Sequence, residues 1–118
     1  DSDPLGEAKI SKDGILQGGR QWKVPVFSLP ARHPTRLYMM SRDPTRLLGY
    51  HNSSIFHLKH PSVRRLQALP EDRPYLDSLG LISSAMRKRE ISIVTARSVF
   101  KALGHLVILG GKYRVDDY

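Results

Sequence analysis

Cysteine is absent from this chain of 118 residues. Its absence excludes a disulfide-stabilised scaffold, a zinc site with thiolate ligands and a cysteine nucleophile. Long apolar runs are missing as well, because runs such as residues 106–109 are far shorter than the roughly 20 residues that a membrane-spanning helix needs. No secretory signal peptide is recognisable. Because the chain does not begin with Met, we expect it to be part of a longer protein.

Acidic residues are scarce: 11 Asp and Glu stand against 19 Lys and Arg, which gives a formal net charge of +8. The excess is uneven, because residues 20–65 contain nine Lys and Arg but only one acidic residue, Asp43. Such a basic segment favours a polyanionic or acidic partner, and nucleic acid, a nucleosome and an acidic protein surface all fit. Apolar residues make up 40% of the chain, which predicts a folded domain with a modest core.

Recognisable catalytic and metal-binding patterns are also missing. The sequence contains neither the Gly-x-Ser-x-Gly motif of serine hydrolases nor the phosphate-binding loop of nucleotide hydrolases. His51, His57 and His60 have no acidic neighbour in the sequence and do not match a His-Glu-x-x-His zinc motif. We interpret the adjacent Asp116 and Asp117 as a hydrated strand end. The sequence therefore predicts a protein that is not an enzyme and uses no metal, cofactor, small-molecule substrate or membrane.

Short strand patterns predict a small sheet. Residues 21–29 read as a strand, and Pro25 within them lacks an N–H donor, so we expect an edge or bulged strand. Residues 37–40 form a second, apolar strand candidate. The β-branched residues of 91–94 predict an extended lead-in to the last helix. Residues 1–12 show no hydrophobic period, so we expect a flexible tail or an extended arm there.

Start and stop signals predict several short helices. Asp43 followed by Pro44 is typical of a helix start, and Gly49 of a helix end. A second predicted helix is capped by Asn52 or Ser53 and broken at His60-Pro61, and a third is capped by Ser62 and carries Val63, Leu66 and Leu69. After a break at residues 70–74, we expect a turn over residues 75–79 that Gly80 ends. The last predicted helix runs from the Thr95 cap to Gly104. The expected core residues are Trp22, Tyr38, Leu47, Leu48, Phe56, Val99, Phe100, Leu103, Val107 and Leu109.

A C-terminal hairpin completes the predicted fold. Gly110-Gly111 lies between two strand-like runs, residues 106–109 and 112–115, and two glycines suit a type I′ turn. The fold class is therefore α+β, with a small sheet that includes this hairpin and several short helices. A helix followed by a hairpin also has the order of the last helix and wing of a winged-helix domain. In that alternative a basic module binds DNA or a nucleosome directly, with Arg97, Lys101, Lys112 and Arg114 facing DNA.

Basic side chains are the candidate contacts with partners or nucleic acid. The segment Arg87-Lys88-Arg89 is a short basic run that suits phosphate contact or nuclear import. The full set of candidates is Arg32, Arg36, Arg42, Arg46, Arg64, Arg65, Arg87, Lys88 and Arg89.

Several stretches together resemble a known fungal family. They are residues 13–20 with the aromatic residue that follows, 37–40, 43–50, 94–100 and 110–118. Their order is similar to that in the conserved domain of the accessory-subunit family shared by the fungal RSC and SWI/SNF chromatin-remodelling complexes. The most telling combination is Thr-Ala-Arg-Ser-Val-Phe, the Gly-Gly pair and the terminal Asp-Asp-Tyr. The resemblance covers about residues 13–118, and it is weakest over 63–91.

The resemblance implies a single remodeller-subunit domain over residues 13–118 and a nuclear location. Members of this family are non-catalytic subunits, so no catalytic residue is carried over. They help to hold together the part of the remodeller that surrounds the ATPase-bearing core and engages nucleosomes. The implied partners are other subunits of a chromatin-remodelling complex, with nucleosomal DNA or histones in addition. The basic segment fits acidic subunits, DNA and histones alike.

Overall fold

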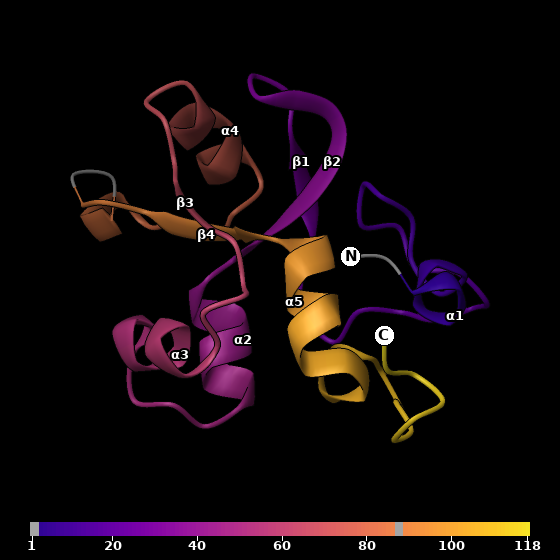
Figure 1. Cartoon of the computed structure of the whole chain (residues 1–118). Coiled ribbons are helices and arrows are strands. Elements are labelled where there is room, and N and C mark those ends of the chain that lie inside the picture. Colours follow the sequence, from indigo (N-terminus) through magenta and orange to yellow (C-terminus); the bar gives the residue numbers. More distant parts are fainter. Residues whose placement is uncertain (1–2, 87–88) are drawn as a thin grey trace.

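An antiparallel sheet with the strand order β1-β2-β4-β3 organises the described part of the chain (Figure 1). The structure is a computed structural model that describes residues 3–86 and 89–118. The strands are β1 (Phe27–Leu29), β2 (His33–Met40), β3 (Arg65–Gln67) and β4 (Ser92–Thr95). Because β4 pairs with both β2 and β3, it joins the two halves of the sheet although it comes last in the chain.

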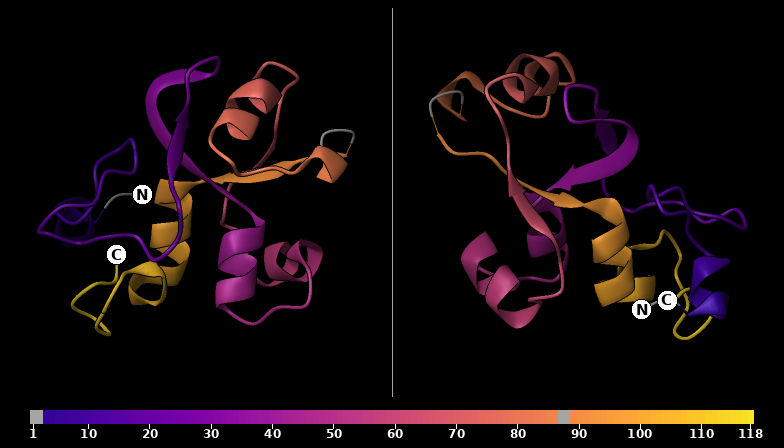
Figure 2. Two further views of the ribbon diagram at one scale, coloured as in Figure 1. Left: turned by 180° about the vertical axis from the view of Figure 1, so that it is seen from behind. Right: turned by 45° about the horizontal axis from the view of Figure 1, so that its top comes forward.

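Short helices lie on both sides of this sheet, which confirms the α+β class. They are α1 (Pro4–Glu7), α2 (Arg42–Leu47), α3 (Ser53–Lys59), α4 (Asp72–Ser78) and α5 (Ala96–Leu103), with 3₁₀ turns at Ser84–Met86 and Gly104–Val107. Figure 2 shows α4 on one side of β4 and α2 and α3 on the other. Among the described residues, every helix is too short or too polar to traverse a bilayer.

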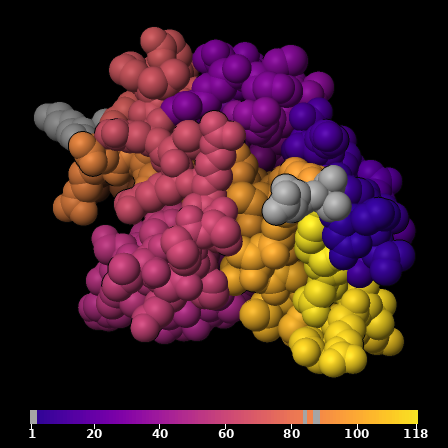
Figure 3. All heavy atoms as spheres, viewed as in Figure 1, coloured from indigo at the N-terminus to yellow at the C-terminus, as the bar shows by residue number. Residues whose placement is uncertain are grey.

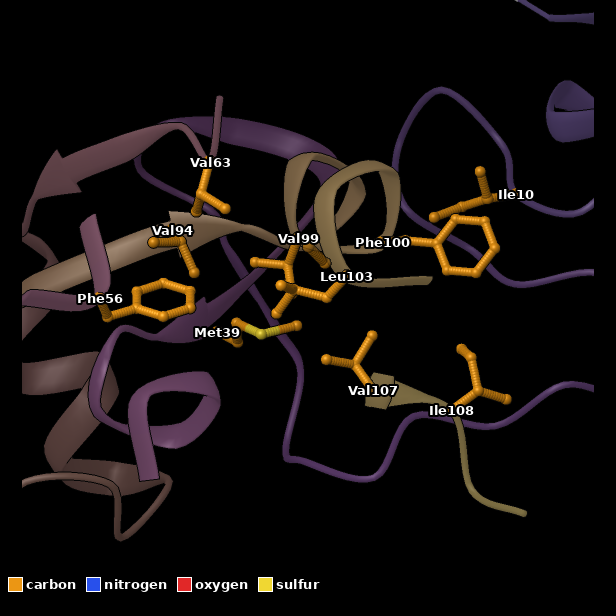
Figure 4. Close-up of a cluster of buried hydrophobic side chains, with 11 residues drawn as sticks. Ile10, Met39, Phe56, Val63, Val94, Val99, Phe100, Leu103, Val107 and Ile108 are labelled. Carbon is orange, nitrogen blue, oxygen red and sulfur yellow. The ribbon is translucent and has the colours of Figure 1, made fainter. Parts of the chain in front are cut away.

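Two apolar cores, one on each face of the sheet, follow from the alternation of side chains along β2 and β4. Met39 and Val94 point to the face covered by α5 and α3, whereas Tyr38, Met40 and Ile93 point to the face covered by α4. Figure 4 shows the first core, in which Phe56 lies close to Met39 and Val94, Val99 lies beside Leu103, and Phe100 lies near Ile10. The second core consists of Phe27, Leu29, Tyr38, Met40, Ala68, Leu76, Ile82, Ile91 and Ile93.

The elements with strong local signals are confirmed. Residues 37–40 lie within β2, and the β-branched lead-in forms β4. The side chain of Asn52 caps α3, since its Oδ1 accepts a hydrogen bond of 2.9 Å from the amide of Ile55. Helix α5 has Thr95 at its N-cap position and Gly104 at its C-cap position, and its buried residues are Ala96, Val99, Phe100 and Leu103.

The predicted helix after Ser62 is wrong. Residues 65–67 form β3, which pairs antiparallel with β4. Val63, Leu66 and Leu69 have helical spacing, but pairing with a distant strand overrides that local pattern. The predicted break over residues 70–74 is also wrong, because α4 begins at Asp72 and contains Pro74. Proline is tolerated there because the first N–H groups of a helix have no partner within the helix.

The start of α2 differs from the predicted one. The helix begins at Arg42, with Ser41 at the N-cap position, so Asp43 lies in the first turn and is not the cap. The helix is otherwise where the sequence placed it, and Gly49 follows it with a positive φ of 77°. The predicted strand over residues 21–29 is confirmed only for Phe27–Leu29, because Trp22 makes an isolated bridge to Ile108.

The predicted C-terminal hairpin is wrong. Gly104–Val107 is a 3₁₀ turn, and residues 112–115 form no strand. Asp116 and Asp117 instead accept hydrogen bonds from Arg20 and His105, which tie this segment back to other parts of the chain. The wing that the winged-helix alternative required is therefore not found in the described residues.

Most of the predicted core is confirmed. Among the expected residues, Tyr38, Phe56, Val99, Phe100, Leu103 and Val107 are buried. Trp22 and Leu48 pack against the first core but are only partly buried. Leu47 is 37% exposed and Leu109 is 62% exposed, so these two residues lie outside the core.

The N-terminal segment is not an extended arm over its described part. Asp3 caps α1, and Ile10 is fully buried in the first core. The tyrosine hydroxyl of Tyr118 accepts a hydrogen bond from the amide of Asp3 and donates one to Glu7. The two ends of the chain therefore pack together, as Figure 1 shows. A sequence pattern could not reveal this, because the contacts join residues more than 100 positions apart.

Candidate interaction surface

Two of the candidate arginines, Arg32 and Arg42, form hydrogen bonds with other parts of the domain. The Nε of Arg32 donates to Asp72 Oδ2 at 2.8 Å, and its Nη2 donates to the carbonyl of Gln67. Asp72 is only 1% exposed. The Nη2 of Arg42 donates to the carbonyl of Leu81 at 2.6 Å. Both guanidinium groups therefore connect elements within the fold.

Arg46, Arg65 and Arg89 lie on three different segments of the chain. Arg46 is exposed on α2, and Arg89 is exposed before β4. The Nε of Arg65 donates to Ser92 Oγ at 2.9 Å across the β3–β4 pair. Arg87 and Lys88 lie outside the described residues. The structure thus does not gather the candidates within its described residues into one surface.

Arg36 and Arg64 do come together, at a hollow of about 170 Å³ at the start of α5. We call it the cationic pocket, and it is lined by Lys12, Arg36, Arg64, Thr95, Arg97, Ser98 and Lys101. Figure 3 shows α5 (orange) exposed between the segment before β3 (pink) and the N-terminal segment (indigo). Sequence analysis missed Lys12, because its neighbours are polar and no periodic pattern connects it to α5.

Backbone hydrogen bonds hold the pocket together. The amide of Arg64 donates to Ser98 Oγ at 2.9 Å, and the amide of Thr95 donates to the carbonyl of Arg64 at 3.2 Å. On the other side, the amide of Leu37 donates to the carbonyl of Asp13 at 2.8 Å. Since Asp13 follows Lys12 and Leu37 follows Arg36, this bond fixes both cationic residues beside α5.

Arg97 and Lys101 are oriented by the packed chain ends. Arg97 forms an ion pair with Glu7 and also donates to the carbonyl of Ser11 at 3.1 Å. The ammonium of Lys101 lies 4.9 Å from the ring centroid of Tyr118, a cation–π distance. Hydrogen bonds from Arg97 and then from Tyr118 lower the pKa of Glu7, which therefore stays ionised in this pair.

The pocket carries a net positive charge, although the ion pair with Glu7 offsets the charge of Arg97. It is lined by five cationic side chains, and none of its described lining residues is acidic. The first turn of α5 adds the partial positive charge of a helix N-terminus. Such an arrangement attracts an anionic group.

The C-terminal segment forms a second, apolar part of the surface. Its exposed side chains are Leu106, Leu109, Tyr113 and Val115. The two aspartates that we interpreted as a hydrated strand end hold this segment in place. Asp117 Oδ1 accepts from the amide of His105 at 2.7 Å, and Asp116 Oδ1 accepts from Arg20 Nε at 2.9 Å.

The same hydrogen bonds change the acidity of both aspartates. The amide of Lys112, and then the guanidinium of Arg20, lower the pKa of Asp116 below its ordinary value of 3.8. Burial tends to raise the pKa of Asp117, but hydrogen bonds from His105 and from the Arg114 amide outweigh burial, so this pKa is lowered as well. A carboxylate with a lowered pKa in the folded state stabilises that state above its ordinary pKa, and the stabilisation is lost as the pH falls through the folded value.

Acid should therefore loosen the C-terminal segment. We expect the amides of His105 and Arg114 to lose protection from hydrogen exchange between about pH 5 and about pH 2, after correction for intrinsic rates. The amide of Val99 in the middle of α5 is the internal control. Protection of His105 and Arg114 that stays constant over this range would contradict the role of the two aspartates.

The histidines contribute to packing. His57 and His60 have ring centroids 5.1 and 5.3 Å from that of Phe56, and His60 Nε2 lies 3.1 Å from the hydroxyl of Tyr50. Burial, together with the charge of Arg65, lowers the pKa of His57. In residues 3–86 and 89–118, no group of three or more potential metal ligands lies close together.

Comparison with known proteins decides the family. The family described as chromatin remodelling complex Rsc7/Swp82 subunit matches residues 1–118, the full length of the chain. The chain belongs to this family. The predicted resemblance is thereby confirmed, and the match also includes α1 and the segment before residue 13.

Curated relatives are subunits of two remodelling complexes. The chain is 38% identical over 116 residues to chromatin structure-remodeling complex subunit RSC7 of Saccharomyces cerevisiae, covering 98% of this chain and 26% of the relative. It is 37% identical to chromatin structure-remodeling complex subunit rsc7 of Schizosaccharomyces pombe, and the match covers 98% of this chain and 30% of the relative. It is 31% identical to SWI/SNF global transcription activator complex subunit SWP82 of Saccharomyces cerevisiae, and the match covers 98% of this chain and 19% of the relative.

The chain thus spans between about a fifth and a third of the length of these Rsc7/Swp82 relatives. No solved structure matches it.

Proposed function

We propose that this chain is a non-catalytic structural domain of a subunit of an ATP-dependent chromatin-remodelling complex in the nucleus. In this role it bridges other subunits and supports engagement of the nucleosome, and through it transcription. The observation that carries the proposal is the match of the full chain to the Rsc7/Swp82 family, whose curated relatives are named as subunits of RSC and SWI/SNF complexes.

The surface supports a role in protein–protein contact. Large apolar side chains are exposed at several places, and those more than half exposed are Leu5, Ile15, Leu58, Leu109, Tyr113 and Val115. Exposed apolar side chains next to charged ones are typical of surfaces that bind other proteins. The cationic pocket adds an anchor for an acidic group.

Direct DNA binding through the central arginines receives less support. Arg32 and Arg42 make hydrogen bonds inside the domain, and Arg65 bonds to Ser92. The other described candidates, Arg36, Arg46, Arg64 and Arg89, lie on different segments, whereas DNA binding favours a continuous basic stripe.

Co-purification tests the proposed function. The full protein that contains this chain, tagged and isolated from a fungal nuclear extract, is treated with nuclease and washed at a salt concentration that strips phosphate contacts. We expect the other subunits of a remodelling complex to remain in stoichiometric amounts, as mass spectrometry would show. Recovery of histones and nucleic acid alone, lost on nuclease treatment, would contradict the proposal.

A further inference from the structure

We propose that the cationic pocket binds a carboxylate side chain from an acidic segment of a partner subunit. The inference rests on the proposed function, because it assigns the chemistry of one subunit contact. Lys12, Arg36 and Arg64 reach the pocket from three separate segments and meet Arg97 and Lys101 of α5. Cationic side chains repel one another, so a cluster of them at one hollow is typical of a site that an anion completes.

The hydroxyl groups of the pocket explain why its ligand should be charged. Thr95 Oγ1 donates to Ser98 Oγ at 2.7 Å, and Ser98 Oγ donates to the carbonyl of Thr95 at 2.9 Å. Both hydroxyl hydrogens are thus used within the domain. The donors offered to a ligand by Lys12, Arg36 and Arg64 are one ammonium and two guanidinium groups. Their charge-assisted hydrogen bonds are about twice as strong as bonds between two neutral groups.

The size of the hollow limits what enters it. A hollow of about 170 Å³ accommodates one carboxylate or phosphate group with a few atoms behind it. A flexible acidic side chain can reach into such a concave site. Two arginines at one site also suit a carboxylate, because a guanidinium can pair with both of its oxygens.

An exposed apolar side chain on the turn that carries Lys12 favours a protein ligand over nucleic acid. Ile15 is 52% exposed and lies on the same turn as Lys12, which a 2.8 Å hydrogen bond from the amide of Ser11 to the carbonyl of Ile15 closes. At Gly14, a Cβ would lie 3.3 Å from Ala96 Cβ, so the turn packs against the start of α5. A peptide with acidic and apolar residues covers both Ile15 and the cations, whereas a DNA backbone offers no apolar side chain for Ile15.

Cross-linking of the assembled complex tests this inference. A carbodiimide joins a lysine amine to a carboxylate that it contacts directly, and mass spectrometry identifies the pair. We expect Lys12 to be linked to an Asp or Glu of another subunit. The double variant Arg36→Gln/Arg64→Gln should reduce this link about ten-fold, because it removes two charge-assisted contacts. The control Arg46→Gln/Lys59→Gln removes the same charge from exposed positions on α2 and α3 and should leave the link unchanged.

Other outcomes separate the inference from the proposed function. If the protein co-purifies with the complex but Lys12 links to no partner carboxylate, or the link resists the pocket variant, the inference is overturned and the proposed function stands. If the pocket variant instead weakens binding of the full protein to a 20-base-pair duplex, as an anisotropy titration would show, the pocket is a phosphate site and the inference is overturned. If the unaltered protein does not co-purify with remodeller subunits, the proposed function itself fails.

Discussion

Replacing Arg32 with alanine should lower the free energy of unfolding by about 3 kcal/mol, because it leaves the buried carboxylate of Asp72 without its cation. Asp72 Oδ2 accepts hydrogen bonds of 2.8 Å from Arg32 Nε and from the amide of Leu69. Its other oxygen, Oδ1, is buried and has no hydrogen-bond partner among the described residues. Urea unfolding of the 118-residue chain measures the loss.

Two further variants test the cause of this loss. Arg36→Ala removes an arginine from the same hairpin without exposing a buried charge, and we expect a change below about 0.5 kcal/mol. The double variant Arg32→Ala/Asp72→Asn should be more stable than Arg32→Ala alone, because the neutral amide needs no cation and can still accept from the amide of Leu69. Equal stability of the single and double variants would rule out the unpaired charge as the cause.

Gly104→Ala should destabilise the chain by about 3 kcal/mol, and two costs contribute. Gly104 has φ 56° and ψ −127°, a conformation that costs an L-residue about 1–3 kcal/mol. A Cβ at this position would also overlap Asp117 Oδ1, the oxygen that accepts hydrogen bonds from the amide and ring of His105. Moving that carboxylate removes charge-assisted hydrogen bonds worth a further 1.5–3 kcal/mol or so, before relaxation.

Gly110→Ala is the matched control for the second prediction. Gly110 has a positive φ of 64°, but nothing lies within 4 Å of the Cβ that alanine would add. We therefore expect a loss of only about 1 kcal/mol, due to the backbone conformation. Urea unfolding compares the two variants, and hydrogen exchange at the His105 amide shows whether Asp117 has moved. Equal losses for both variants would contradict the overlap with Asp117.

The sequence predicted those elements whose stability has a local cause. Helix α5 has one apolar face and a terminal glycine, and α3 has an asparagine cap, so both are visible in a short window. The segment that forms β3 looked helical because its partner is 25 to 29 positions away: Arg65 faces Val94, and Gln67 faces Ser92. The Gly-Gly pair looked like a hairpin because the carboxylates that hold the C-terminal segment bond to distant groups.

The candidate site could be predicted only in part, for a similar reason. The count of arginines predicts a cationic surface, but composition cannot tell an arginine that faces solvent from one that pairs internally. Arg32 and its partner Asp72 are 40 positions apart, so their pairing leaves no local signal. Lys12 joins Arg36 and Arg64 only because the N-terminal turn folds back against α5.

The contact between the two ends of the chain has a consequence for synthesis. Helix α1 is made first, yet the hydroxyl that bonds to Asp3 and Glu7 belongs to Tyr118, the last residue of this chain. A ribosome adds residues at about 5–20 per second and holds the newest ones in its exit tunnel, so α1 must wait for several seconds without its partner. Closing a loop of nearly the full domain is also entropically costly and slows folding. During most of that interval α5 has not been made, so Ile10, which packs with residues of α5 in the first core, is exposed on the nascent chain. Ile10 is therefore an expected point of chaperone contact.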